Sequence, residues 1–177
     1  MRVLVDATTL IALGQIGELD LLTCLDGELV IPLKVQAEVS TEPARTNVEN
    51  ISTETHRCEW NSPAQRNMLY SRAEQILGED TENGDVVIIA SVLRTSDLKG
   101  RDIGVVSDDQ RIRTVAQGFS ATVTGTIGVI VRAVEVRDMT ADEGKALVRR
   151  VDSHGLHMTG ELREKAYELV EEAAEGE

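Results

Sequence analysis

The chain has 177 residues, of which 41% are hydrophobic and only 2% aromatic, and its formal net charge is −13. This length suits one domain with its own core, and the acidic balance argues against a general nucleic-acid binder, which usually carries an excess of Lys and Arg. No apolar run approaches the roughly 20 residues that span a bilayer, and the N-terminus lacks the apolar stretch of a signal peptide. We therefore expect a cytoplasmic protein without a membrane partner.

The chain opens with a predicted strand at residues 2–6, a short run of Val and Leu that ends in Asp6. A helix with an apolar face follows, and Thr8 or Thr9 is expected to cap it. A second short helix is predicted at residues 18–25. The alternation of strand and helix begins here and continues along the chain.

A second strand is predicted at residues 28–31, where the apolar run ELVI follows a turn. Pro32 then suits the first position of a helix, because its missing N–H is not needed there. Glu38 lies on that helix beside two apolar positions. Residues 41–64 show no apolar period and are rich in polar residues, so a long polar loop is predicted, and loops of this length are usually functional or mobile.

Residues 65–78 have a helical pattern, with Met68 and Ile76 among the apolar positions near one face. Asn83 is expected to cap the next helix, which carries Asp85 in its first turn. The residues after Asp85 are apolar almost all round, so this helix should be buried.

A third strand is predicted at residues 103–106 and a helix at 109–117. A short final strand at residues 121–124 leads into a helix that Gly125 opens. This alternation predicts an α/β fold, a three-layer α/β/α sandwich with a central parallel sheet.

Two further helices are predicted in the tail, residues 137–177, which we expect to pack on the domain or extend it. Thr140 and Glu143 have the spacing of a capping box. Thr159 can cap the last helix, which has an apolar stripe.

Acidic side chains stand where strands end or where a buried helix begins. Asp6 and the pair Asp108–Asp109 follow strands, and the carboxyl ends of parallel strands share one edge of a sheet, where ligands bind. Asp85 opens a buried helix, where the free amides favour a carboxylate. Glu38 follows the second strand and can reach the same edge. The pattern predicts one acidic cluster.

Carboxylates that converge in this way repel one another, and a cation relieves the repulsion. Oxygen ligands without His or Cys favour Mg²⁺ or Mn²⁺ over Zn²⁺. Such a site supports phosphoryl chemistry. Taken singly, these residues have simpler explanations, because Asp109 can cap its own helix and Glu38 can lie on a solvated face. Only their joint placement favours a metal site.

Basic residues near the third strand offer a local phosphate-binding rim or are ordinary solvated charges, and the sequence leaves both open. They are Arg94, Lys99, Arg101, Arg111 and Arg113. Other metal-ligating types give weaker signals. His154 and His157 straddle a predicted turn, His56 lies in the polar loop, and Cys24 and Cys58 form no CxxC pair.

Five stretches with their order and spacing resemble the PIN-domain family of metal-dependent nucleases. They are VLVDATTLIAL at 3–13, VIPLKVQAEV at 30–39, NGDVVIIASVL at 83–93, VVSDDQRIRTVA at 105–116 and TGTIGVIVRA at 124–133. The resemblance implies a PIN-like nuclease domain over residues 1–136. The tail is similar to the C-terminal helical pair of one VapC-like branch.

The resemblance implies a role for each acidic residue. Asp6, Glu38, Asp85 and Asp109 match the four acidic positions of the family, where the third is usually Glu. Asp108 stands where Asn is common and is a further candidate metal ligand.

The resemblance also implies substrate contacts and partners. Thr8 or Thr9 can hydrogen-bond a metal-bound water or a phosphate, and Ser107 begins a hydroxyl-then-acid motif. Family members cleave RNA with one or two Mg²⁺ or Mn²⁺ ions, often as toxins held by a small antitoxin protein, and often as homodimers. The same is expected of this chain.

Other families fit the pattern less well. A haloacid-dehalogenase-like phosphatase needs a second Asp two residues after the first, where this chain has Thr8. A receiver domain needs an acidic pair near the first strand, and Asp6 has no acidic neighbour. The alternative that stays open is a catalytically silent PIN-like scaffold that binds RNA or protein partners.

Overall fold

The structure is a computed structural model that describes residues 1–51, 60, 62–96, 98 and 102–176. Four residues named above lie outside the described residues. They are His56, Cys58, Lys99 and Arg101.

The described residues form one four-stranded parallel sheet, as the sequence predicted, in the order β2-β1-β3-β4. Its strands are β1 (Arg2–Val5), β2 (Glu28–Val30), β3 (Ile103–Val106) and β4 (Thr122–Thr124). In the central pair, Val5 is in register with Val106. The residues that follow β1 and β3, Asp6 and Ser107, therefore lie side by side at the carboxyl edge of the sheet.

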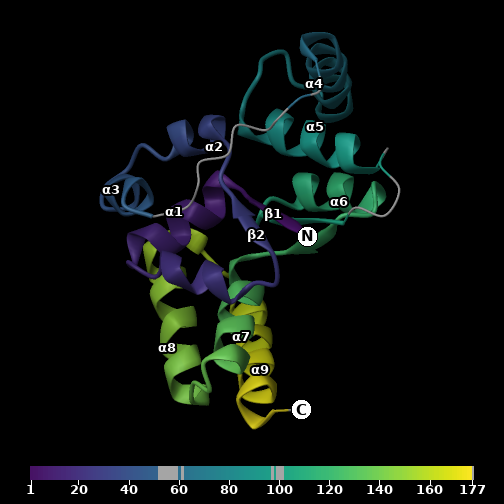
Figure 1. The fold of residues 1–177 in the computed structure, drawn as a ribbon. Helices are drawn as coiled ribbons and strands as arrows, with labels where there is room; N and C mark the ends of the chain where they lie inside the picture. Colours follow the sequence, from purple (N-terminus) through teal and green to yellow (C-terminus); the bar gives the residue numbers. More distant parts are fainter. Residues whose placement is uncertain (52–59, 61, 97, 99–101, 177) are drawn as a thin grey trace.

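Helices cover both faces of the sheet and complete the predicted three-layer α/β/α sandwich (Figure 1). The helices α5 (Gly84–Ser96) and α6 (Gln110–Gly118) contact each other and the strands on one side. The helices α1 (Ala7–Gln15) and α7 (Thr126–Val136) lie on the other side. Every residue from Val86 to Leu93 is buried, which explains why α5 is apolar all round.

The first helix is capped differently from the prediction. Asp6, and neither Thr8 nor Thr9, is the N-cap of α1, and its Oδ1 accepts a hydrogen bond from the backbone N–H of Ala7. The strand ends one residue earlier than expected, so the first residue after it has both the extended backbone and the short acceptor that a cap needs. The short helix predicted next is the 3-10 helix η1 (Leu19–Cys24).

The described part of residues 41–64 contains a helix where a polar loop was predicted, and the helix predicted after Pro32 is present. Pro32 caps α2 (Leu33–Glu38) and so stands just before the helix. The helix α3 (Ala44–Glu49) lies inside the predicted loop, where Ala44 and Val48 are buried and Ala44 packs on Gly14 of α1. Two apolar residues four apart are too few to show a helical period.

The helix α4 (Pro63–Leu77) is present as predicted and begins at an N-cap, Ser62. Its buried side is different, because Met68 and Ile76 are exposed whereas Tyr70 is buried. The apolar period included Met68 and Ile76 but not Tyr70. The ring of Tyr70 packs against the ring of Trp60.

The tail forms α8 (Ala141–Val151), the turn η2 (Asp152–Leu156) and α9 (Gly160–Glu175). The capping box of Thr140 and Glu143 is confirmed, as is the Thr159 cap. The helices α8 and α9 pack on each other and on α7, and their buried residues belong to the same hydrophobic cluster as the sheet. In the part of the chain that the structure describes, no helix has the length and apolar character needed to cross a membrane.

One close contact tests whether this tail folds together with the rest of the protein. A Cβ on Gly144 of α8 would lie 2.5 Å from Val170 Cγ1 and 2.8 Å from Val134 Cγ2. We expect Gly144→Ala to lower the free energy of unfolding by about 1–3 kcal/mol through overpacking, in a single cooperative transition measured by urea denaturation.

Gly160→Ala at the start of α9 is the matched control, because its Cβ would have no heavy atom within 4 Å. It should leave stability unchanged or raise it slightly. A loss confined to a separate, weaker transition would show instead that the tail unfolds independently of the sheet.

Candidate active site

The site is built where the direction of chain travel across the sheet changes. From β1 the chain crosses to β2 on one side, and from β3 it crosses to β4 on the other. In open α/β sheets this arrangement leaves a crevice beyond the carboxyl ends of the two central strands. Asp6 and Ser107 are the first residues after β1 and β3, so the backbone places both at this crevice.

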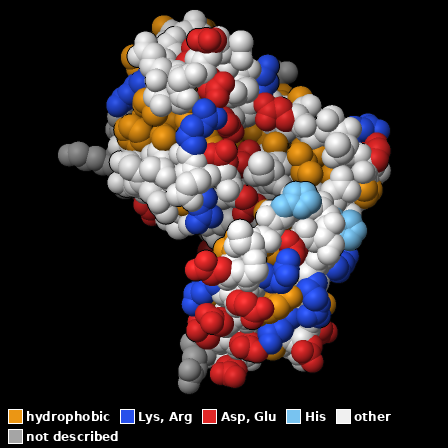
Figure 2. Space-filling view, turned by 180° about the vertical axis from the view of Figure 1, so that it is seen from behind, with side chains coloured by type: hydrophobic (Ala, Val, Ile, Leu, Met, Phe, Trp, Pro, Cys, Tyr) orange, Lys and Arg blue, Asp and Glu red, His pale blue; other side chains and the backbone are white. Residues whose placement is uncertain are grey.

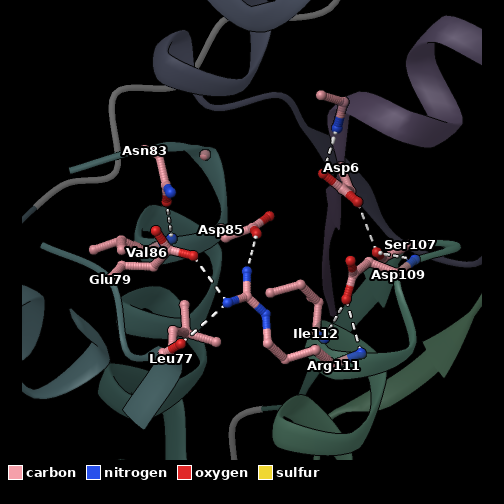
Figure 3. A network of polar contacts seen from close by, with 12 residues as sticks. Asp6, Leu77, Glu79, Asn83, Asp85, Val86, Ser107, Asp109, Arg111 and Ile112 are labelled. Carbon is pink, nitrogen blue, oxygen red and sulfur yellow. Dashed lines mark hydrogen bonds and ion pairs between the residues drawn. The ribbon is translucent and has the colours of Figure 1, made fainter. Parts of the chain in front are cut away.

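Asp6 is almost fully buried, with 3% of its surface exposed. Its Oδ2 accepts hydrogen bonds from Thr8 Oγ1 at 2.8 Å and from Ser107 Oγ at 2.7 Å, and Figure 3 shows the second of these. Together with the Ala7 N–H this makes three hydrogen bonds to one carboxylate. Because a carboxylate offers about four acceptor positions, Asp6 is held rigidly and keeps capacity for one further partner.

Asp109 is linked to Asp6 through Ser107. The hydroxyl of Ser107 accepts the backbone N–H of Asp109 at 3.1 Å and donates to Asp6. Asp109 caps α6, because its Oδ1 accepts the N–H groups of Arg111 at 2.7 Å and Ile112 at 3.0 Å. The capping explanation for Asp109 is therefore right, and it fixes a carboxylate at the crevice with its other oxygen outside the cap.

Asp85 comes to the site from α5, which lies on the other side of the sheet from α1, the helix that Asp6 caps. Asn83 caps α5 by accepting the N–H of Val86 at 2.9 Å, as predicted, and this sets Asp85 in the first turn (Figure 3). Burial, the negative charge of Asp6 and, more weakly, that of Asp109 together raise the pKa of Asp85 to about 6, against the opposing effect of Arg111. Three carboxylates thus sense one another, as the sequence predicted for this edge of the sheet.

Arg111 lies inside this acidic cluster. Its guanidinium donates to Asp85 Oδ2 at 3.0 Å, to Glu79 Oε1 at 2.8 Å and to the Leu77 carbonyl at 3.0 Å (Figure 3). The sequence suggested a phosphate contact for Arg111, and the structure shows it paired with acidic side chains. Glu79 was missed, because it lies in a short polar connection without a pattern and only the fold brings it to Arg111.

Glu38 reaches the site through the backbone of α5. Its Oε1 accepts the N–H of Gly84 at 2.7 Å, next to Asp85. A Cβ on Gly84 would lie only 2.5 Å from Glu38 Oε2, so a side chain there would displace the carboxylate. This explains why glycine precedes Asp85, and it places Glu38 in support of the α5 N-terminus.

Asp108 has different partners from the other carboxylates. Both of its oxygens bind Thr126 at the start of α7, Oδ1 through the backbone N–H at 2.9 Å and Oδ2 through the hydroxyl. Asp108 was predicted to be a metal ligand, and in the structure its carboxylate binds the first turn of α7, whose N-cap residue is Gly125. Thr126 was not singled out, although it stands in the stretch 124–133.

Asp108 and Asp109 line a cleft of about 440 Å³. Thr8 lines the cleft, and Gly155 and Leu156 of the C-terminal turn form part of its wall. Arg113 donates to the Ser107 carbonyl at 3.2 Å and so braces the turn after β3. Figure 2 shows acidic side chains at the centre of this face, with histidines next to them.

The side chains at this site decide whether a divalent metal ion would fit there. Among the described residues, no group of three or more His, Cys, Asp or Glu side chains is already arranged to hold an ion. The chemistry nevertheless fits, since Asp6, Asp85 and Asp109 offer only carboxylate oxygens, which suit a hard divalent cation. Arg111 supplies the positive charge that this crowding requires.

A comparison with known families gives one finding. A family model described as a PIN domain matches residues 2–172. No curated protein and no solved structure matches the chain. The matched span includes every site residue named above, all of α8, and α9 as far as residue 172.

The raised pKa of Asp85 predicts an unusual effect of neutralising it. Its folded-state pKa of about 6 lies above the ordinary value of 3.8, so ionisation destabilises the fold as pH rises between these values. In the absence of divalent ions, Asp85→Asn should therefore raise the free energy of unfolding at pH 8 by about 1–3 kcal/mol. The gain should shrink as pH falls through 6 and vanish near pH 4.

Denaturant titrations at several pH values measure this effect. Asp80→Asn is the control, because Asp80 is exposed and no more than five residues away. A loss of stability in Asp85→Asn at pH 8 would contradict the electrostatic account.

Proposed function

The chain belongs to the PIN-domain family, whose fold is a nuclease fold, and from this premise we propose that it is a divalent-metal-dependent endoribonuclease that hydrolyses RNA phosphodiesters. The observation that carries the proposal is the meeting of Asp6, Asp85 and Asp109 at the crevice between β1 and β3, close enough for two of the charges to raise the pKa of the third. Proteins keep such unfavourable clusters mainly where chemistry needs them.

The proposed ligands are Asp6, Asp85 and Asp109, with Glu38 holding the end of α5 on which Asp85 stands. A bound Mg²⁺ or Mn²⁺ supplies a water of lowered pKa and neutralises charge on the scissile phosphate. Ser107 and Thr8 fix the orientation of Asp6 by donating to its Oδ2. The exposed side of Thr8 is available to a phosphate oxygen of the substrate.

Arg111 has a specific part in this proposal. Its side chain is 44% exposed and its two ion pairs involve partly exposed carboxylates. Ion pairs of this kind contribute about 0–1 kcal/mol each. Exchanging Asp85 for a substrate phosphate is therefore energetically easy, and Arg111 can hold the carboxylates together in the free protein and contact RNA in the complex.

The contacts to RNA and the protein partners are also proposals. A protein with a net charge of −13 repels RNA at long range, so binding must come from short-range contacts, and Arg111 and Arg113 are the candidates nearest the carboxylates. A small antitoxin protein as partner, a toxin role and a homodimer are proposals that come from the resemblance to the VapC-like branch.

A second candidate function has one observation in its favour. Arg111 already compensates Asp85, and the described carboxylates are not arranged as a metal cage. Both are what a catalytically silent scaffold that binds RNA or protein partners would show.

The proposed endoribonuclease activity is tested by comparing substitutions in the carboxylate cluster with a substitution of Asp108. Asp6→Asn and Asp109→Asn should each reduce Mn²⁺-dependent cleavage of a broad panel of labelled single-stranded RNAs by at least 100-fold, with the fold retained by circular dichroism. Asp108→Asn weakens the hydrogen bonds at the start of α7. Its activity should stay within about tenfold of wild type, because the loss of about 1 kcal/mol of helix-end stabilisation affects the stability of the fold and leaves the three clustered carboxylates in place.

Calorimetric titration of Mn²⁺ provides a readout that does not need a substrate. The ion should bind wild type and Asp108→Asn but bind Asp6→Asn far more weakly. Mn²⁺ binding without cleavage of any RNA would leave a metal-binding scaffold. Failure of Mn²⁺ to bind wild type, together with equal activity in wild type and Asp6→Asn, would overturn the catalytic role.

A further inference from the structure

We propose that the pocket between α2, α4 and α5 binds one unpaired base of the RNA, and that guanine is the base it fits best. The proposal rests on the proposed function for its substrate class, but base binding itself does not require cleavage. The pocket has a volume of about 380 Å³, which is in the range of small-ligand sites, roughly 300–1,000 Å³. It lies at the end of the molecule where these three helices meet (Figure 1).

Aromatic side chains are concentrated at this pocket. The chain has one Trp, two Tyr and one Phe, and Trp60 and Tyr70 both line this cavity. Their ring centroids are 5.3 Å apart with the planes inclined at 73°, an edge-to-face contact. Unpaired RNA bases are recognised mainly by stacking on such rings. The pocket therefore offers a stacking platform in a chain that has few aromatic residues.

Trp60 is the side chain on which a base can stack. Tyr70 is buried to 8% exposure, and the Arg66 guanidinium lies 4.3 Å from its ring centroid. Trp60 is only half-buried, and it packs against the core and has Arg94 5.6 Å from its ring centroid. Leu33 stands at the same cavity with 48% of its surface exposed. An apolar side chain so exposed gives the base a further apolar surface in the same pocket.

The polar groups of the pocket match the edge of guanine. Arg66 Nη2 contacts both oxygens of Glu82, at 2.9 and 2.8 Å, and both side chains are more than a third exposed. The Glu82 carboxylate keeps acceptor positions beyond these two bonds. Guanine presents two adjacent donors, N1–H and the N2 amino group, which one carboxylate accepts together. Adenine, cytosine and uracil do not present two such donors side by side.

Cationic groups at the pocket suit the backbone that carries the base. Lys34 is exposed at the pocket wall, and Arg66 lies beside it. Phosphate neutralisation by Lys and Arg supplies much of the affinity of nucleic-acid sites. Because Glu82 offsets one of these two positive charges, the lining residues carry one net positive charge, and the pocket is locally less repulsive to RNA than a net charge of −13 would indicate.

The pocket is joined to the proposed active site by a short and well-held segment. Glu82 precedes Asp85 by three residues, so their Cα atoms lie within about 11 Å of each other. The intervening Gly84 is bound by Glu38 of α2, the same helix that begins with Leu33 at the pocket. A base held here therefore belongs to a nucleotide close to the scissile phosphate.

The experiment uses Trp60 as its own reporter, because it is the single tryptophan of the chain. The intact protein is titrated, in EDTA so that no divalent ion is present, with guanosine, adenosine, cytidine and uridine, and with the four homo-oligomeric RNA pentamers. N-acetyltryptophanamide corrects for absorption by the bases. We expect saturable quenching, at least fivefold tighter for guanosine than for the other nucleosides, with higher affinity for the oligomers.

A pair of matched variants tests the assignment of Glu82. Glu82→Gln should reduce the preference for guanosine to less than twofold while quenching persists. Glu135→Gln is the control, because Glu135 forms an equally exposed ion pair with Arg132 in α7, away from the pocket. Thermal unfolding checks that both variants are folded. Lys34→Gln should weaken the oligomers and leave guanosine unaffected, since the nucleoside lacks a phosphate.

The outcomes separate this proposal from the proposed function. No quenching by any nucleoside or oligomer overturns the pocket even if the protein cleaves RNA. Equal quenching by all four nucleosides with Glu82→Gln unchanged overturns the guanine preference. Guanosine-selective quenching that Glu82→Gln abolishes supports the pocket, even if no RNA is cleaved and the endoribonuclease fails.

Discussion

The hydrogen bond between Ser107 and Asp6 is the interaction on which the site depends. It ties the residue after β1 to the residue after β3 at 2.7 Å, in a place where both side chains are buried. The same Asp6 carboxylate caps α1, and the same Ser107 hydroxyl accepts the backbone of Asp109. Buried polar groups are stable only when their partners are in place, so two strands and two helix starts are fixed relative to one another by one short network.

The electrostatics of the cluster follow from that rigidity. Asp85 faces Asp6 and Asp109 from another layer of the sandwich, and neither of those carboxylates can turn away without losing its hydrogen bonds. The repulsion is relieved by Arg111, which extends from the helix that Asp109 caps. A fold selected only for stability would place an uncharged side chain at Asp85. The retained carboxylate indicates that this edge of the sheet serves a purpose other than holding the protein together.

Sequence reasoning located this cluster because strand ends and helix starts are local features. Asp6, Asp85 and Asp109 each stand at such a boundary, and parallel pairing brings the boundaries together. The same reasoning could not identify partners that are distant in sequence. Asp108 stands next to Asp109 in the chain, yet its side chain binds Thr126 in the first turn of α7, after β4. Glu38 binds a backbone amide that no periodicity could identify. Predicting those contacts needs the packing of α2 and α7, which depends on tertiary structure.

The acidic surface restricts where the molecule can contact RNA. Long-range attraction cannot bring RNA to a chain with a net charge of −13, so the proposed recognition of RNA has to rely on contacts that act over a few ångströms. The carboxylate cluster and the pocket at Trp60 both include residues at the N-terminus of α5, where Glu38 binds the N–H of Gly84. Because α5 is buried along most of its length, neither place can shift without the other. A base recognised at one would thereby fix the position of a phosphate at the other, which is how an acidic protein could be selective for RNA without binding it generally.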